Sequence, residues 1–343
     1  MTDLQAEMKR MKSKVDSLML DRLLPKGSTV REVDLLYKMM RDYPSRKGKG
    51  MRPFLCITTC RAIGGAEDDA LLTAACLELF QNWILIHDDL EDGSELRRGE
   101  PTLHRKHPAS LAINAGDALH ARMWGALLEN STRLGPDKTL RILEEFSGMV
   151  NETTEGQHME LGWVEGRRWD LTEADYFQMC TRKTSWYTVA GPCRLGAIVA
   201  GAGREELDAL RSFGTALGVA FQIQDDALNL VGDEQKYGKA KSDDIAEGKR
   251  TLIVLHLMDS ADSGTRARLM GIMNKGRSEK TPEDVDYVMS LVESTDAVGY
   301  ARKRASELMK RALATLKTVD WRGDTESVRL LESFAKFAVE REW

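Results

Sequence analysis

Apolar residues recur at helical spacing along almost the whole chain. Leu4, Met8, Met11 and Val15 follow an i, i+4, i+7, i+11 pattern near the start, and residues at this spacing share one face of a helix. The same spacing returns at residues 330–338. No stretch shows the convincing alternation of a β-strand, so the pattern predicts an all-α protein.

Turn-forming residues separate these apolar stretches. Clusters of Gly, Pro and Asp stand at residues 25–28, 64–65, 135–137, 201–203 and 232–233. Thr172 and Thr281 each precede an acidic first turn, as N-capping residues do. No Ser- or Pro-rich linker divides the chain, so we predict one all-α domain over residues 1–343, with ten or more helices. The polar segment from Gly232 to Gly248 is the one long loop candidate, and such loops are often functional lids.

Composition narrows the class of protein. The chain has 343 residues, 42% hydrophobic and 30% charged, with only 8 Pro, which is typical of a helical globule. Its 5 Cys are an odd number without C-x-x-C pairs, so we expect reduced core residues. The net charge of −5 and the absence of a basic block argue against nucleic acid. No apolar run approaches about 18 residues and no signal peptide is evident, so we expect a cytoplasmic protein without membrane insertion.

Two acidic clusters end apolar helical stretches. The first contains Asp88, Asp89 and Asp92, and the second contains Asp225 and Asp226, followed by Asn229. Carboxylates four residues apart on a helix repel one another by about 0.2–0.5 kcal/mol when exposed. A divalent cation reverses this repulsion, and oxygen ligands without nearby Cys or His favour Mg²⁺. The alternative for each cluster taken alone is a solvated helix end.

Basic residues accompany the acidic clusters. Lys49 and Arg52 flank a Gly-rich turn that opens a helix, where free N–H groups also attract anions. Arg97 and Arg98 follow the first cluster closely, and further cations stand at Lys183, Lys239 and Lys249. Carboxylates combined with these cations predict a diphosphate bound through Mg²⁺, and a reaction in which a diphosphate leaves.

These residues form a set that resembles the trans-isoprenyl diphosphate synthases. Residues 88–104 resemble the first Asp-rich motif with its R-R-G-x-P-T-x-H tail, and residues 221–229 resemble the second. Residues 48–53 resemble the G-K-x-x-R-P element, and residues 183–184 the K-T pair. The resemblance implies a large all-α bundle around a central active-site cavity, usually a homodimer. It also implies head-to-tail condensation of isopentenyl diphosphate with an allylic diphosphate, with release of diphosphate.

The resemblance also assigns roles to individual residues. It implies three Mg²⁺ per active site, with Asp88, Asp92 and Asp225 as ligands and with Asp89, Asp226 and Asn229 as supporting residues. The allylic diphosphate would be held by Arg97, Lys183, Lys239 and Lys249. The diphosphate of isopentenyl diphosphate would be held by Lys49, Arg52, Gln81 and Arg98. Thr184 and Gln222 would position the departing group.

Some positions depart from the common family pattern. Gln81 stands where many relatives have His, although both side chains donate hydrogen bonds. Asn229 replaces a frequent Asp, so we expect the second cluster to hold its metal less strongly. The segment before residue 244 is one residue longer than usual, so either Asp243 or Asp244 matches the family aspartate.

Product length depends on the helix before the first cluster. Trp83 precedes Asp88 by five residues, which is roughly 7.5 Å along a helix axis and nearly the same face. In the resembling family the growing chain follows this helix, and bulk at this position stops it. With Ile84 beside Trp83, we predict the C15 product farnesyl diphosphate. The C20 product geranylgeranyl diphosphate is the alternative, as is a Trp83 that only fills the core.

Three other functions are compatible with part of the pattern. A class I terpene cyclase shares an Asp-rich metal site but uses one prenyl diphosphate, so it has no need for Lys49, Arg52 and Arg98. An HD-type phosphohydrolase has a His-Asp pair like His87-Asp88 but requires an upstream His that this chain lacks. A non-catalytic partner subunit is not expected to keep both acidic clusters.

Overall fold

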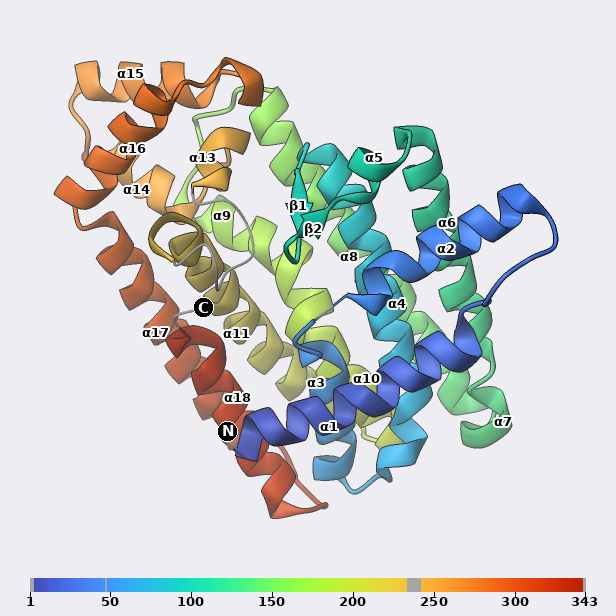
Figure 1. The fold of residues 1–343 in the computed structure, drawn as a ribbon. Helices are drawn as coiled ribbons and strands as arrows, with labels where there is room; N and C mark the ends of the chain where they lie inside the picture. The colour runs from blue at the N-terminus through green and yellow to red at the C-terminus, as the bar shows by residue number, and fades with distance from the viewer. Residues whose placement is uncertain (1–2, 47, 233–241, 342–343) are drawn as a thin grey trace. The chain divides into compact units, whose positions relative to one another are not determined.

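The computed structural model describes residues 3–46, 48–232 and 242–341, and these residues are almost all helical (Figure 1). They fall into two compact units. Unit 1 comprises Met1–Met149, Tyr187–Ser212 and Thr315–Phe334, and unit 2 comprises Val150–Trp186, Phe213–Ala314 and Ala335–Trp343. The all-α prediction is confirmed. The prediction of one domain stays a prediction.

The elements of unit 1 come mainly from the first half of the chain. In order they are α1 (Asp3–Ser17), a π-helical turn (Leu18–Leu23), α2 (Arg31–Ser45), α3 (Met51–Ile63), α4 (Glu67–Glu91), β1 (Leu96–Arg97), β2 (Glu100–Pro101), α5 (Leu103–Lys106), α6 (Ala109–Leu128), α7 (Ser131–Leu134) and α10 (Gly191–Ala200). Four helices contribute residues to both units: α8 (Pro136–Glu165), α11 (Arg204–Val231), α17 (Ala297–Leu316) and α18 (Thr325–Glu340).

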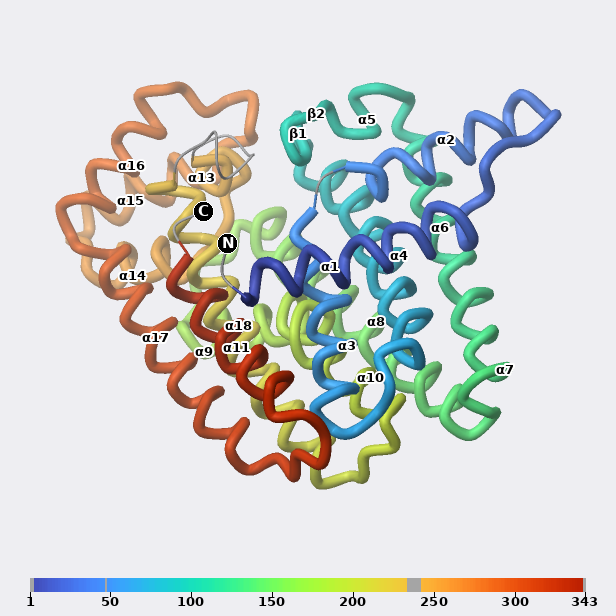
Figure 2. Tube along the Cα trace, turned by 60° about the horizontal axis from the view of Figure 1, so that its bottom comes forward, coloured from blue at the N-terminus to red at the C-terminus, as the bar shows by residue number. Residues whose placement is uncertain are grey.

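Helix α3 is the centre of unit 1. Every residue from Met51 to Ile63 except Arg61 is buried, because the helix is apolar on all sides and therefore needs neighbours on all sides. It packs against α1, α4 and α10, which lie around it in both views (Figures 1 and 2). Its first turn carries Arg52, so a predicted binding residue starts from the most buried helix of the unit.

Helix α4 carries the first acidic cluster at its C-terminal end. Among the described residues it is the one helix long and apolar enough to cross a membrane, but 67% of its apolar window is buried inside the protein. Its neighbours are α3 and α6. Such burial is typical of a core helix, which explains the apolar composition without a membrane.

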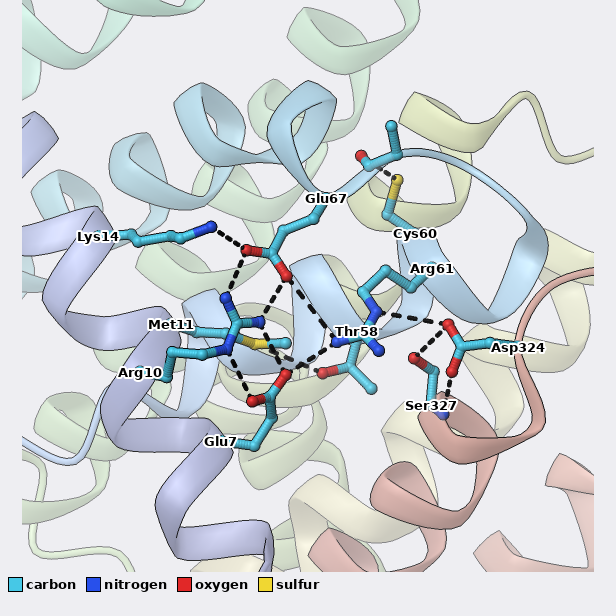
Figure 3. A network of polar contacts seen from close by, with 11 residues as sticks. Glu7, Arg10, Met11, Lys14, Thr58, Cys60, Arg61, Glu67, Asp324 and Ser327 are labelled. Atoms are coloured by element: carbon cyan, nitrogen blue, oxygen red, sulfur yellow. Dashed lines mark hydrogen bonds and ion pairs between the residues drawn. The ribbon is translucent and has the colours of Figure 1, made fainter.

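A network of ion pairs fastens α1 to the rest of unit 1 (Figure 3). Arg10 contacts Glu67 at the start of α4 at 2.5 Å, and Arg61 of α3 contacts Glu7 at 2.8 Å. Arg61 also reaches Asp324, 3.4 Å away. Because the pairs share partners, they form a network rather than isolated surface contacts, and α1 is held against α3 and α4 on its polar side as well as its apolar side.

The elements of unit 2 surround the second acidic cluster. Besides the shared helices they are α9 (Glu173–Cys180), a π-helical stretch (Thr181–Ala190, which continues into unit 1), α13 (Asp243–Glu247), α14 (Leu252–Ser260), α15 (Ser263–Met273), a 3₁₀ turn (Arg277–Glu279) and α16 (Pro282–Ser294). Helix α14 packs against α9 and α16, and α16 also contacts α13 (Figure 1).

Several local predictions can be compared with the structure. Thr172 and Thr281 both form capping boxes, with Asp175 and Asp284, and the five cysteines are free and buried. The sequence pattern missed the two-stranded hairpin β1–β2, in which Leu96 pairs with Pro101. Two residues per strand are too few to show alternation, so hydrophobic periodicity cannot detect this element.

Close packing of α3 and α10 predicts a stability effect at Gly196. A Cβ added there would lie 2.0 Å from the carbonyl oxygen of Cys56, so Gly196→Ala must displace backbone. We expect it to lower the free energy of unfolding by about 1–3 kcal/mol, measured by urea denaturation. Gly125→Ala on the exposed side of α6, where nothing lies within 4 Å, is the control. We expect it to be neutral or stabilising, and equal midpoints for both variants would contradict this packing.

Candidate functional site

Asp89, in the first acidic cluster, is a fully buried carboxylate with 0% exposure. Its Oδ2 accepts a hydrogen bond from the Tyr43 hydroxyl at 2.5 Å, and its Oδ1 accepts one from Nε of Arg97 at 2.8 Å. Burial of a charge is costly unless it is paired and hydrogen-bonded. Asp89 meets both conditions inside unit 1, so it fixes Tyr43 and Arg97 rather than facing solvent.

Asp88 and Asp92 are the more accessible members of this cluster. Both are partly exposed, and the Asp92 N–H donates to the Asp88 carbonyl oxygen at 2.8 Å, which closes the last turn of α4. Arg97 lies 3.3 Å from Asp88 Oδ2. Residues four apart share a helix face, so Asp88 and Asp92 lie together where α4 ends.

The buried pair shifts the pKa values of its partners. Burial, followed by the charge of Asp89, raises the pKa of the Tyr43 hydroxyl far above its usual range. Burial alone would lower the pKa of Arg97, but the contact with Asp89 outweighs it and raises that pKa. Tyr43 therefore stays a neutral donor and Arg97 stays a cation. The sequence reasoning missed Tyr43, because a single Tyr in Asp42-Tyr43-Pro44 carries no motif.

Four arginines of unit 1 influence one another's charges near the first cluster. Two of them are paired with carboxylates, and two donate only to neutral acceptors. Arg46 lies 2.6 Å from Asp42, and Arg97 is paired with Asp89. Arg52 and Arg98 form no ion pair with a carboxylate in the described part of the chain. Arg52 donates to Gln81 Oε1 at 2.6 Å and Thr188 Oγ1 at 2.8 Å, and Arg98 donates to the Tyr43 carbonyl oxygen at 3.2 Å.

Guanidinium groups held only by neutral acceptors keep their charge available for an anion. Burial is the main cause that lowers the pKa of Arg98, and the neighbouring arginines act in the same direction. The Gly-rich turn with Lys49 lies against this group, since a Cβ on Gly48 would be 3.2 Å from the Arg98 guanidinium. The structure thus brings Arg52, Gln81 and Arg98 close to the turn, as the sequence predicted.

The second acidic cluster repeats one feature of the first inside unit 2. Asp226 is 6% exposed and accepts hydrogen bonds from the Tyr176 hydroxyl at 2.6 Å and from Gln222 Nε2 at 2.7 Å. Both donors are neutral, so burial raises the pKa of Asp226 to about 7. Asp225 is more exposed and pairs with Arg341. Like Tyr43, Tyr176 and Arg341 lie outside every motif and were missed.

The predicted K-T pair lies in a π-helical stretch of unit 2. Thr184 Oγ1 donates to Gln222 Oε1 at 2.7 Å, so Thr184, Gln222 and Asp226 form one chain of hydrogen bonds. Lys183 Nζ lies 2.5 Å from Glu160 Oε2. Short π-helical insertions are frequent at functional sites. Here Lys183 contacts α8, and the next residue, Thr184, contacts α11.

Asn229 and Lys249 meet at the start of α13. Asn229 Oδ1 accepts a hydrogen bond from the Asp244 N–H at 3.1 Å, and Lys249 Nζ lies 3.9 Å from Asp244 Oδ1. Asp243 instead contacts Arg277 at 2.7 Å. Of the two candidate aspartates, Asp244 is therefore the one beside predicted site residues. Lys239 lies outside the described residues.

Trp83 lies in the packing between α4 and α6. It is 7% exposed, and its ring stacks on His120 with centroids 3.9 Å apart and planes at 17°. Phe80 meets the same indole edge-on at 5.5 Å, and Ile84 is partly exposed. Trp83 thus has a specific partner on a neighbouring helix, which the spacing argument did not anticipate.

The carboxylates of the acidic clusters are suited to Mg²⁺ only if phosphate oxygens of a bound ligand complete its coordination. Among the described residues, no group of three His, Cys, Asp or Glu side chains is arranged so that it could hold a metal ion. The carboxylate oxygens of Asp89 and Asp226 already accept buried hydrogen bonds. Asp88 and Asp92 in unit 1 and, separately, Asp225 in unit 2 are partly exposed, with Asp88 beside Arg97 and Asp225 beside Arg341. Mg²⁺ is usually bound by one or two carboxylates plus phosphate oxygens, so this chemistry fits a metal that arrives with a diphosphate.

Comparison with known proteins agrees with this chemistry. A family model described as polyprenyl synthetase matches residues 33–292. The short chain isoprenyl diphosphate synthase of Methanothermobacter thermautotrophicus is 34% identical over 86% of this chain and 87% of that protein. The geranylgeranyl diphosphate synthase of Saccharolobus solfataricus is 32% identical over 86% of each.

A solved structure supports the same assignment. Geranylgeranyl pyrophosphate synthase from Corynebacterium glutamicum, complexed with isoprenyl diphosphate and magnesium, has a TM-score of 0.87 at 27% identity, covering 99% of this chain and 100% of that one. The helices and acidic clusters define an isoprenoid synthase fold. The chain belongs to the polyprenyl synthetase family. It is a trans-prenyltransferase, as the motifs predicted.

The buried Asp89 predicts a stability effect of Tyr43. Tyr43→Phe removes the donor to Oδ2 and leaves that oxygen without its hydrogen bond, so we expect a loss of about 1.5–3 kcal/mol in the free energy of unfolding. Chemical denaturation measures it. Tyr37→Phe on the same helix is the control, because Tyr37 is only partly buried. A loss no larger than that of the control would contradict the role of Tyr43.

The raised pKa of Asp226 predicts a pH-dependent effect of Asp226→Asn. The folded pKa of about 7 lies above the ordinary 3.8, so the folded state holds the proton more tightly and stability falls as pH rises across that interval. Asn carries no charge, so we expect it to gain stability relative to wild type between about pH 4 and about pH 8. Urea unfolding in EDTA measures this. Asp208→Asn, exposed on the same helix, is the control, and a pH-independent difference would refute the prediction.

Proposed function

We propose that the protein condenses isopentenyl diphosphate with an allylic diphosphate, head to tail, in the presence of Mg²⁺. The allylic C–O bond breaks and diphosphate leaves. The isopentenyl double bond then attacks the allylic carbon, and a proton is lost to regenerate an alkene. The observation that carries this proposal is the pair Arg52 and Arg98, whose guanidinium groups form no ion pair with a carboxylate among the described residues.

This pair favours two diphosphate substrates over one. A terpene cyclase needs cations for a single diphosphate, and the basic residues that follow the acidic clusters would suffice. Arg52 and Arg98 donate only to neutral acceptors among the described residues. Together with Gln81 and Lys49 they form a separate basic group, which is suited to a diphosphate bound without a metal. We assign it to isopentenyl diphosphate.

The acidic clusters supply the remaining roles. We assign Asp88, Asp92 and Asp225 to Mg²⁺, with Lys183 and Lys249 on the allylic diphosphate, as the family motif suggests. Mg²⁺ bound there would offset the negative charge that grows on the departing diphosphate. Arg97 was predicted to bind this diphosphate directly. Because Arg97 is held by Asp89, we propose instead that it acts mainly by fixing the acidic turn.

The product is proposed to be C20 geranylgeranyl diphosphate, not the C15 product expected from Trp83. Relatives are named as short chain or geranylgeranyl synthases, and others as C25 geranylfarnesyl synthases. Trp83 is stacked on His120, so its bulk is directed at α6. The argument from five residues of helical rise did not take into account the direction of this side chain.

We further propose that the protein is a cytoplasmic homodimer and that each chain functions as one domain. The exposed apolar residues of α6 support a dimer, since Leu111, Ile113 and Leu128 are 41%, 42% and 57% exposed. Contact with a second copy would remove these apolar side chains from water, which favours association. Analytical ultracentrifugation would decide, and a monomer at working concentration would refute this assembly.

Product analysis tests the proposed function. Incubation with isopentenyl diphosphate and C5, C10 or C15 allylic primers should give mainly C20 product, and EDTA should abolish turnover. Trp83→Ala removes the ring that fills the space between α4 and α6. Since we propose that the product grows along α4, we expect longer products. Trp321→Ala, elsewhere in unit 1 with its N–H on the Leu316 carbonyl oxygen, should leave product length unchanged. Mainly C15 product from the wild type would restore the earlier prediction.

A further inference from the structure

Glu78 is a buried carboxylate that no motif accounts for. It lies on α4, one turn before Gln81, and is 6% exposed. In the described part of the chain its Oε1 has no hydrogen-bond partner, and neither do Oδ1 of Asn82 on the same helix and Nε of Arg52 on α3. Buried polar groups are normally satisfied, so a cluster of exceptions calls for an explanation.

The charges that face Glu78 come from three elements. Burial raises the pKa of Glu78, and Arg52 of α3, Arg98 after α4 and Lys12 of α1 act against that rise, while Asp16 adds to it. In return, Glu78 is the largest influence that raises the pKa of Arg98. Glu78 is therefore electrostatically coupled to the two arginines that have no carboxylate contact.

Helix α1 brings Lys12 to the same place. A Cβ on Gly50 would lie 2.8 Å from Cβ of Lys12, so the stem of Lys12 covers the Gly-rich turn next to Lys49. The ion-pair network of Glu7, Arg10 and Glu67 fixes α1 in this position (Figure 3). Lys12 forms an ion pair with Asp16 on its own helix. The opposite effects of these two charges on Glu78 therefore largely cancel.

We propose that Glu78 is the internal counter-anion of Arg52 and Arg98, and that it competes with the diphosphate of isopentenyl diphosphate for these two guanidinium groups. Without a ligand, the carboxylate offsets the repulsion between two buried cations. With a ligand, it lies beside a second anion in a weakly screened environment, which opposes binding. The inference rests on the proposed function, because it assumes that this basic group takes a diphosphate.

Competition of this kind suits repeated elongation. Each condensation leaves the diphosphate of isopentenyl diphosphate on the lengthened product, still in the site where it bound. That diphosphate must leave before the next isopentenyl diphosphate enters. A fixed anion that restores the charge balance of Arg52 and Arg98 favours its departure.

Glu78→Gln tests the proposal, because it keeps the shape and removes the charge. Binding of isopentenyl diphosphate is measured by calorimetry in EDTA, so that the acidic clusters cannot act through a metal. We expect about 5-fold tighter binding or more, a lower KM for isopentenyl diphosphate alone, and a lower melting temperature that the ligand restores. Unchanged binding would mean that Glu78 carries no charge, and weaker binding would mean that it supports the ligand; either result overturns the proposal.

Two further variants make the result unambiguous. Glu78→Met removes the charge without adding an N–H donor, and it should also tighten binding if Glu78→Gln folds poorly. Glu145→Gln breaks a partly buried pair with Arg194 at 2.6 Å in the same unit, so it should lower stability and leave the affinity unchanged. If the wild type itself does not bind isopentenyl diphosphate, the second diphosphate site of the proposed function fails, which is a different outcome from unchanged binding in the variant.

Discussion

The burial of one carboxylate in each acidic pair is the constraint on which the candidate site depends. Asp89 and Asp226 are both enclosed, and each is held by a tyrosine hydroxyl from another helix of its own unit, Tyr43 or Tyr176. This fixes the rotation of α4 and α11 about their axes. Asp88 and Asp225, the neighbours in sequence, are then partly exposed on their own helices. The buried residue positions the exposed one.

The two buried carboxylates are compensated differently, and this sets their electrostatics. Asp89 is paired with the guanidinium of Arg97, which compensates the burial of its charge. Asp226 receives only the neutral donors of Tyr176 and Gln222, and burial raises its pKa to about 7. The same reasoning distinguishes the arginines. Arg97, which is paired with a carboxylate, stabilises the fold, whereas Arg52 and Arg98 donate only to neutral acceptors and are suited to binding a ligand anion.

The sequence predicted the elements and the motifs because both are local. Helical periodicity found α1 and α18, and Thr172 and Thr281 cap helices as their neighbours suggested. The partners that hold the motifs in place could not be found this way. Tyr43 and Tyr176 acquire their roles through contacts with residues tens of positions away, and nothing in their own surroundings distinguishes them from ordinary core. Asp243 and Asp244 show the same limit, since only the contacts of Asp244 with Asn229 and Lys249 separate them.

Product length shows why correct local geometry is not sufficient. The position of Trp83, five residues before Asp88, follows from helical rise alone, and the structure keeps it on α4 as expected. What the indole blocks depends on its neighbours, and His120 stacks on it from α6. A stacked ring cannot rotate freely into the path of a growing chain, because it would lose this contact and the edge contact with Phe80 together. Under the proposed function, we expect a length limit on α4 to depend on the packing of α4 against α6, so that a change in His120 would act on the product through Trp83.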